Sequence, residues 1–154
     1  MYKSISVWLK LTDGPSKGKF ALQKRLEIHR QFICQPAWSG GVENSETLEK
    51  AIRRECKEEL GVEFAGNFDF LKLKFIGTEG FVKNGQRSEG FHYFCKINTA
   101  DLDKAKIHPD AMSEFIFIGK KDKFFPVSSG FNPKDNVILF DDEYKILKNL
   151  LHGN

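Results

Sequence analysis

The fold of this 154-residue chain is decided by residues 40–62, GGVENSETLEKAIRRECKEELGV. The stretch opens on a pair of glycines, whose backbone reaches conformations that other residues avoid. Ser45 or Thr47 can then cap a helix, because either hydroxyl can accept a hydrogen bond from the first helical turn. We expect the helix to run over residues 46–60 and to end at Gly61, a residue suited to the left-handed cap position.

Three glutamates of this predicted helix share one side of it. At about 100° per residue, Glu55, Glu58 and Glu59 fall within an arc of roughly 100°. The arc borders an apolar stripe that includes Ile52 and Cys56, so the carboxylates are expected at the edge of the core. Like charges repel more strongly there, and an Mg²⁺ or Mn²⁺ ion, which prefers oxygen ligands, would offset the repulsion. A solvated charged helix is the alternative.

The spacing across residues 40–62 reproduces a known motif. In order it is Gly40, five residues, Glu46, seven residues, Arg54-Glu55, an apolar position, one residue, Glu58-Glu59, one residue, Gly61 and an apolar position. Seven fixed identities at these intervals match by chance about once in 10⁸ starting positions. The stretch resembles the Nudix box, and the chain is therefore similar to members of the Nudix hydrolase family. The resemblance implies a single domain over residues 1–154 with the Nudix fold, an α+β arrangement of a mixed β-sheet sandwiched between α-helices.

The resemblance also implies roles for the residues of the box. In that family the helix glutamates hold Mg²⁺ or Mn²⁺ against a diphosphate. The implied metal ligands are Glu55, Glu58, Glu59 and the backbone carbonyls of Ser39 and Gly40. The implied catalytic residues are the three glutamates and Arg54, which would orient Glu55. Glu46 and Gly61 are implied to be structural residues of the box. Many family members have glycine where this chain has Ser39, but a carbonyl survives the substitution.

Residues outside the box supply further candidates. Arg25 ends a predicted strand and resembles a family arginine near the substrate phosphates, with an exposed strand-end arginine as the alternative. Trp38 could stack on a nucleobase as a substrate-binding residue, or it could be buried and steady the loop. Family members often take one more acid from outside the box. Spacing does not choose among the candidates Glu89, Glu114 and Asp110.

The rest of the chain predicts strands on both sides of the box helix. The strand-like segments are 3–11, 19–25, 62–64, 67–75, 91–97 and 115–118. An Asn84-Gly85 pair predicts a hairpin turn, and residues 101–105 and 141–151 predict helices. This order favours a mixed sheet between helices, in agreement with the resemblance. The 120–136 loop contains three phenylalanines, Phe124, Phe125 and Phe131, that could line a base pocket.

Composition limits the classes of partner and compartment. The 24 basic and 21 acidic residues leave a net charge of +3, a mild excess that suits a phosphate-bearing ligand and does not indicate nucleic acid. Three cysteines without C-x-x-C spacing predict reduced thiols in a cytoplasmic protein. No apolar run approaches the roughly 20 residues that cross a bilayer, so no membrane association is expected. A homodimer is compatible with the sequence.

The predicted function is metal-dependent hydrolysis of a phosphoanhydride bond in a small-molecule diphosphate, most naturally a nucleotide derivative. Carboxylate-held metal would neutralise the diphosphate and stabilise the transition state. The absence of a Ser–His or Cys–His constellation in the sequence agrees with a reaction that needs no side-chain nucleophile. The alternative is a Nudix-fold module that binds a nucleotide or phosphorylated ligand without turnover. A nucleic-acid-binding protein would require a basic stripe with interleaved aromatic residues.

Overall fold

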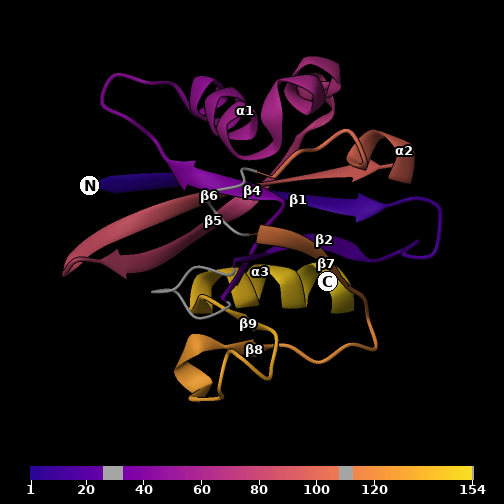
Figure 1. Ribbon diagram of the computed structural model, residues 1–154. Coiled ribbons are helices and arrows are strands. Elements are labelled where there is room, and N and C mark those ends of the chain that lie inside the picture. The colour runs from indigo at the N-terminus through magenta and orange to yellow at the C-terminus, as the bar shows by residue number, and fades with distance from the viewer. Residues whose placement is uncertain (26–32, 108–112, 154) are drawn as a thin grey trace.

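The computed structural model describes residues 1–25, 33–107 and 113–153, which form a mixed β-sheet with helices on both faces (Figure 1). In chain order the elements are β1 (Tyr2–Leu11), β2 (Phe20–Arg25), β3 (Cys34–Gln35), β4 (Trp38–Gly41), α1 (Leu48–Asn67), η1 (Phe70–Lys72), β5 (Lys74–Lys83), β6 (Gln86–Ile97), α2 (Thr99–Leu102), β7 (Ser113–Ile118), β8 (Phe125–Pro126), η3 (Val127–Ser129), β9 (Ile138–Leu139) and α3 (Asp141–His152). The helix α1 lies above the sheet in Figure 1 and α3 lies below it. The predicted α+β sandwich is confirmed.

The main sheet has seven strands and divides at one edge. Its central order is β3-β2-β1-β6-β5, while β4 pairs with β1 and β7 pairs with β2. The pair β1–β6 is parallel, and the other pairs of this sheet are antiparallel. The strand β1 pairs with β4 through residues 4–7 and with β2 through residues 9–10. Because β1 changes partner along its length, the start of the box lies next to the end of β2.

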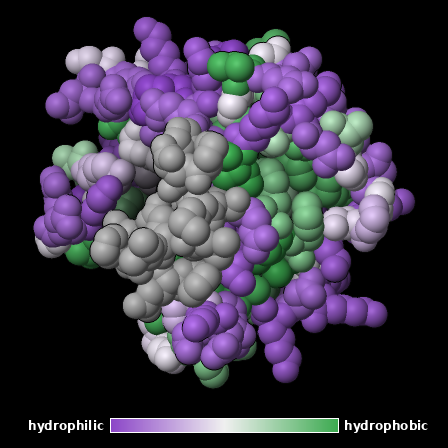
Figure 2. Space-filling model, viewed as in Figure 1, coloured by the Kyte–Doolittle hydropathy of each residue, from purple (hydrophilic) through white to green (hydrophobic). Residues whose placement is uncertain are grey.

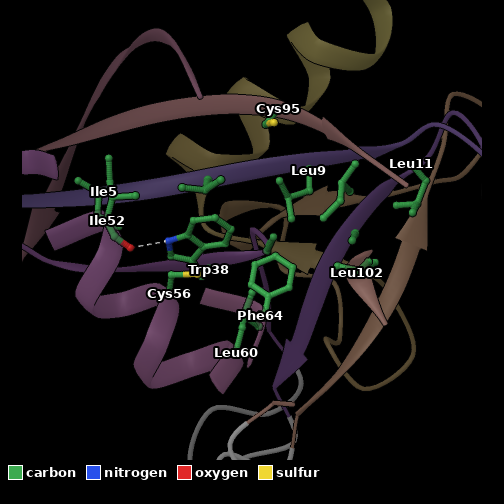
Figure 3. Close-up of a cluster of buried hydrophobic side chains, with 14 of the residues drawn as sticks. Ile5, Leu9, Leu11, Trp38, Ile52, Cys56, Leu60, Phe64, Cys95 and Leu102 are labelled. Atoms are coloured by element: carbon green, nitrogen blue, oxygen red, sulfur yellow. Dashed lines mark hydrogen bonds between the residues drawn. The ribbon is translucent and has the colours of Figure 1, made fainter. Parts of the chain in front are cut away.

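Alternating side chains of β1 contribute to two separate hydrophobic cores. Ile5 and Leu9 are fully buried on the face covered by α1 (Figure 3). Trp8 is fully buried on the opposite face, against residues of α3 that include Leu147. Both faces of β1 are therefore buried over residues 5–9.

The box helix begins two residues later than predicted, after one of the two expected caps, and it also ends later than predicted. Thr47 is its N-cap, with a side chain that accepts a hydrogen bond from the backbone of the first turn. Gly61 does adopt a positive φ of 90°, but the helix resumes after it and continues to the end of α1. The predicted strand over residues 62–64 is therefore wrong. The continuation buries Phe64, whose ring lies 6.0 Å from that of Trp38, and this packing favours helix over strand.

The segment after α1 is also less extended than predicted. Within the expected strand 67–75, η1 forms a short 3-10 turn capped by Asp69, and β5 begins only after it. The turn directs Phe68 and Phe70 onto Trp38, with ring centroids 5.4 and 6.3 Å away. These two rings extend the core beneath α1.

Other predicted elements are present with shifted ends. Asn84 and Gly85 both have positive φ and join β5 to β6, which confirms the hairpin turn. The helix expected over residues 101–105 forms slightly earlier as α2, capped by the side chain of Asn98. The terminal helix α3 matches its prediction. Within the described segments, no helix combines the length and apolar character that a membrane crossing requires.

The 120–136 loop is ordered by contacts among its own aromatic residues. Phe125 and Phe131 pack with ring centroids 4.4 Å apart, and Phe124 packs on Tyr144 of α3 at 5.4 Å. The loop also contains β8, which pairs with β9 just after the loop, and the turn η3. Its three phenylalanines thus contact protein neighbours, and Phe131 is 51% exposed, so their role in a base pocket stays a prediction.

Candidate active site

Arg54 joins the start of the box to its helix. Its Nε and Nη2 donate to the two carboxylate oxygens of Glu46, at 2.8 and 2.9 Å. Its Nη1 donates to Glu55 Oε1 at 2.7 Å, and its Nη2 also donates to the carbonyl of Gly41 at 2.8 Å. One guanidinium therefore ties the preceding loop, the strand β4 and the helix α1 together.

The pair formed by Arg54 and Glu46 is ionised over the physiological pH range. Hydrogen bonds from Arg54, followed by one from the backbone N–H of Glu43, lower the pKa of the Glu46 carboxyl to about 2. The carboxylate in turn raises the pKa of Arg54. Because both oxygens of Glu46 are engaged by this guanidinium, its arrangement is that of a bracing residue.

Glu55 lies against the backbone of β4, in a space that a glycine leaves open. A Cβ at Gly40 would lie 2.1 Å from Cδ of Glu55 and 2.3 and 2.5 Å from its two oxygens. The Glu55 side chain is only 14% exposed. The close approach explains why glycine suits this position of the strand, because any side chain there would displace the Glu55 carboxylate.

The other two box glutamates differ in their environment. Glu58 is 58% exposed and lies 3.4 Å from Nη1 of Arg54. Glu59 accepts a hydrogen bond of 2.9 Å from Nε2 of Gln23, on β2. The same nitrogen donates to the carbonyl of Ala37 at 2.7 Å. Gln23 thus holds Glu59 across the division between β2 and β4.

Sequence reasoning missed two polar residues that the structure buries. Gln23 is 2% exposed, and the available signal was its position two residues after Ala21, on the core-facing side of β2. Glu143 is 7% exposed in the first turn of α3. Acidic residues are common in the first turn of a helix, because the positive end of the helix dipole stabilises them. The sequence therefore carried no signal that Glu143 is buried.

Two of the predicted site residues, Ser39 and Trp38, directly precede the box. Ser39 lies on β4, where it pairs with Ser6 of β1. Trp38 is fully buried, and its Nε1 donates to the carbonyl of Ile52 at 3.0 Å (Figure 3). Its predicted role in stacking on a nucleobase is therefore wrong, because neither ring face reaches the surface. Arg25 ends β2, and its side chain lies outside the described part of the structure.

The acid candidates from outside the box lie on different faces of the sheet. Glu89 is half-buried on β6, on the same side of that strand as Phe91, which packs in the α1 core. Glu114 is exposed on β7, on the same side as Ile116, which packs in the α3 core. Asp110 falls outside the described residues. The two described acids are therefore not brought together.

A cleft of about 730 Å³ opens on the α3 side of the divided sheet. Its lining comes from the start of β1, from β4, from the tip of the β5–β6 hairpin, from η3 and from the start of α3. The residues are Tyr2, Ser4, Ser6, Gln35, Ser39, Gly40, Gly80, Phe81, Val82, Lys83, Asn84, Val127, Ser128, Phe140, Asp141, Asp142, Glu143 and Lys145. The cleft thus reaches the glycine strand of the box. Figure 2, viewed as in Figure 1, shows hydrophobic residues exposed to the right of the centre, between hydrophilic residues above and below them.

The donor chemistry at the box fits Mg²⁺ or Mn²⁺, because it consists of carboxylate and carbonyl oxygens. The space left by the missing Cβ of Gly40 places Glu55 directly against the strand that carries two of those carbonyls. Among the described residues, no group of three or more acidic, His or Cys side chains converges tightly enough to hold a metal ion. Arg54 contacts one carboxylate oxygen of Glu55 and one of Glu58, so each carboxylate could keep this contact and offer its second oxygen to an ion.

A mixed sheet between a carboxylate-bearing helix and a terminal helix defines the class of Nudix-fold proteins. A sequence model described as the NUDIX domain matches residues 4–144. The chain therefore belongs to the NUDIX domain family, and its enzyme class is that of the Nudix hydrolases. No curated protein matches it.

Solved structures show the same fold at low sequence identity. A Caenorhabditis elegans Ap4A hydrolase in a binary complex is 16% identical with a TM-score of 0.60, over 97% of this chain and 95% of that one. The NUDIX domain of Shewanella oneidensis NrtR, complexed with ADP ribose, is 14% identical with a TM-score of 0.61, over 96% and 85%. A bifunctional NMN adenylyltransferase/ADP ribose pyrophosphatase from Francisella tularensis is 16% identical with a TM-score of 0.56, over 97% and 40%.

Proposed function

We propose that this protein is a metal-dependent pyrophosphohydrolase that cleaves a phosphoanhydride bond in a nucleoside-diphosphate-linked substrate. The observation that carries the proposal is the placement of Glu55, which Arg54 holds against the bare backbone of Gly40. A solvated charged helix would not require a glycine beneath one of its carboxylates. The substrate class is supported by two structural neighbours, a hydrolase of Ap4A and a domain with bound ADP ribose, because both molecules contain a nucleoside joined to a phosphate chain.

The box residues would act by holding oxygens in place before the reaction begins. Mg²⁺ or Mn²⁺ bound by Glu55, Glu58, Glu59 and the carbonyls of Ser39 and Gly40 would neutralise the diphosphate and the charge that develops during cleavage. Glu55 is oriented by Arg54 and Glu59 by Gln23. Preoriented carboxylates avoid reorganisation during the chemical step, which is the main source of electrostatic catalysis.

A carboxylate must also accept the proton of the attacking water. We assign this role to the group formed by Glu55, Glu58 and Glu59 and not to one of them, since all three lie on the same side of the box helix. Glu89 and Glu114 are the alternatives from outside the box. Glu58 is exposed and Glu59 is held by an amide, so the two can be tested separately.

The test is phosphate release from a panel of nucleoside-diphosphate derivatives, with Mg²⁺, with Mn²⁺ and with chelator, using a coupled phosphatase. We expect metal-dependent release from one class of compound. Glu58→Gln and Glu59→Gln should each lower kcat by about 100-fold or more, the usual loss when a preoriented charge is removed. Glu63→Gln is the matched control, because Glu63 is exposed on the same helix outside the box. Near-normal turnover in both box variants would contradict the assignment.

The panel also separates the enzyme from a binding module. A folded protein that binds Mn²⁺ and nucleoside diphosphates but releases no phosphate from any compound would favour a module that holds its ligand without turnover. A folded protein without metal binding would show that the acidic face of α1 is only a solvated surface.

A further inference from the structure

A pocket at the far end of the sheet from the box is lined by three lysines. It has a volume of about 510 Å³ and lies where β1 and β6 end and β5 begins. Lys72 belongs to the turn η1, Lys74 to the start of β5 and Lys96 to the end of β6. Exposed lysines from three elements therefore line one pocket.

The register of β1 separates this pocket from the box. Gly40 pairs with Ile5, near the start of β1. Thr12, which lines the pocket, directly follows β1, and its backbone N–H donates to the carbonyl of Ile97 at 2.9 Å. Thr12 lies seven residues beyond Ile5, which is about 23 Å along a strand at about 3.3 Å per residue. Among the described residues, none lines both this pocket and the cleft that reaches Gly40.

Positive charge exceeds negative charge in the lining of the pocket. Within the part of the chain that the structure describes, none of its three lysines forms a salt bridge. The one acid among the described lining residues is Asp101, which lies 3.3 Å from Nζ of Lys104. Burial raises the pKa of Cys95 in the lining, the charge of Lys72 lowers it and the charge of Asp69 raises it, so both charges reach the pocket wall.

These groups suit an anion that carries several charges. Like charges that converge repel one another, and a multivalent anion offsets the repulsion. The ammonium group of lysine binds phosphate as a compact point charge, whereas planar carboxylates suit the fork of arginine. Asn98 also lines the pocket, and its side-chain oxygen accepts from the backbone N–H of Asp101 at 2.7 Å, so its NH₂ group is the part available as a further donor.

The lining does not suit a nucleic-acid strand. Proteins that bind single strands place aromatic side chains along a basic groove, so that successive bases stack on them. Phe94 is the one aromatic residue among the described lining residues, and it is half-buried and packs in the α3 core. A chain of phosphate groups without bases therefore matches the pocket better than a polynucleotide.

We propose that this pocket binds a short polyphosphate anion, at a site separate from the box. The site is a second binding function, which neither the sequence motif nor the proposed reaction requires. The inference does not rest on the proposed function, because no box residue and no metal ion take part in it.

NMR titration with tripolyphosphate, in the presence of chelator and at an ionic strength of about 0.15 M, tests the proposal. We expect a dissociation constant of about 1 mM, with the largest shifts at the amides of Lys74 and Asn98 and little change at Gly40. Lys72→Gln, Lys74→Gln and Lys96→Gln together should weaken binding by about tenfold to 100-fold, because each exposed ion pair contributes about two- to fivefold.

A second triple variant controls for net charge. Lys17→Gln, Lys121→Gln and Lys134→Gln remove three exposed lysines from other parts of the surface, and this variant should bind tripolyphosphate as tightly as the natural protein. Equal weakening in both triple variants would overturn the inference, because binding would then follow from net charge alone. So would shifts centred on Gly40, or tighter binding of a single-stranded RNA than of tripolyphosphate at the same concentration of phosphate groups. An absence of hydrolysis in the metal panel would instead overturn only the proposed reaction.

Discussion

Replacing Gly40 by alanine tests whether the position of Glu55 matters for the reaction. The new Cβ would lie 2.1 Å from Cδ of Glu55, whereas ordinary contact begins near 3.4 Å. The carboxyl must therefore retreat by about 1.3 Å, the difference between these two distances. Because a misplacement of about 1 Å in an active site costs about 100-fold in rate, we expect kcat to fall by about two orders of magnitude.

The same substitution should leave the fold almost unchanged. The group displaced is the free end of a flexible side chain, so it can move without shifting the backbone. Weakening the hydrogen bond between Arg54 and Glu55 should lower the free energy of unfolding by about 1 kcal/mol. Alanine should raise it by about 0.4–1 kcal/mol, because it restricts the unfolded chain more than glycine does. The free energy of unfolding should therefore change by less than about 1 kcal/mol. Urea unfolding measures this change.

Gly66→Ala is the matched control for Gly40→Ala. This substitution adds the same methyl group near the end of α1, outside the box, where the new Cβ would meet no atom within 4 Å. Its turnover should equal that of the natural protein. A Gly40→Ala variant with unchanged turnover would refute the reasoning, since Glu55 would then be free to move without loss. A variant that unfolds would also refute it, because the overlap would have reached the backbone.

Three further predictions concern the buried residues. The free energy of unfolding should fall by about 2 kcal/mol between pH 6.5 and pH 5, as measured by urea unfolding. Over this range His92 takes up a proton in the unfolded chain, whereas in the folded chain its pKa is about 4 and the ring stays neutral. The variant His92→Gln should lack this contribution to the pH dependence. Burial raises the pKa of Cys34 to about 11 and that of Cys56 to about 12. Both thiols should therefore react with a thiol reagent about 100-fold more slowly in the folded than in the unfolded protein. Equal rates in the two states would contradict their burial. Trp38→Phe should lower the free energy of unfolding by about 1–3 kcal/mol, because the carbonyl of Ile52 loses the hydrogen bond from the Trp38 indole. A raised KM at unchanged stability would instead indicate that Trp38 stacks on the substrate, which its burial excludes.

Local patterns were sufficient to predict the first part of the box helix. Its cap at Thr47, its apolar stripe and the glycine that follows it are all short-range signals. The continuation beyond Gly61 could not be predicted in this way, because it depends on Phe64 packing against Trp38 from a different strand. The sequence predicted a cap conformation at Gly61, and the positive φ agrees with it. Only the tertiary contact explains why the chain returns to helix after this residue.

The polar residues around the box could not be predicted, for a related reason. Gln23 contacts Glu59 only because β1 changes its partner from β4 to β2 and brings the end of β2 beneath α1. The burial of Glu143 depends on how α3 packs under the same division of the sheet. Both positions look unremarkable in the sequence, since a glutamine in a strand and an acid in a first turn are ordinary.

The division of the sheet explains how one ligand could contact residues from both of its faces. Glu59 belongs to α1 on one face and Glu143 belongs to α3 on the other, yet the charge of Glu59 contributes to raising the pKa of Glu143. A continuous ladder of strands would separate these two carboxyls by a full layer of backbone and side chains. The cleft on the α3 side is lined by both Gly40 of β4 and Glu143 of α3. A molecule bound in this cleft would therefore contact the box strand and the start of α3 together.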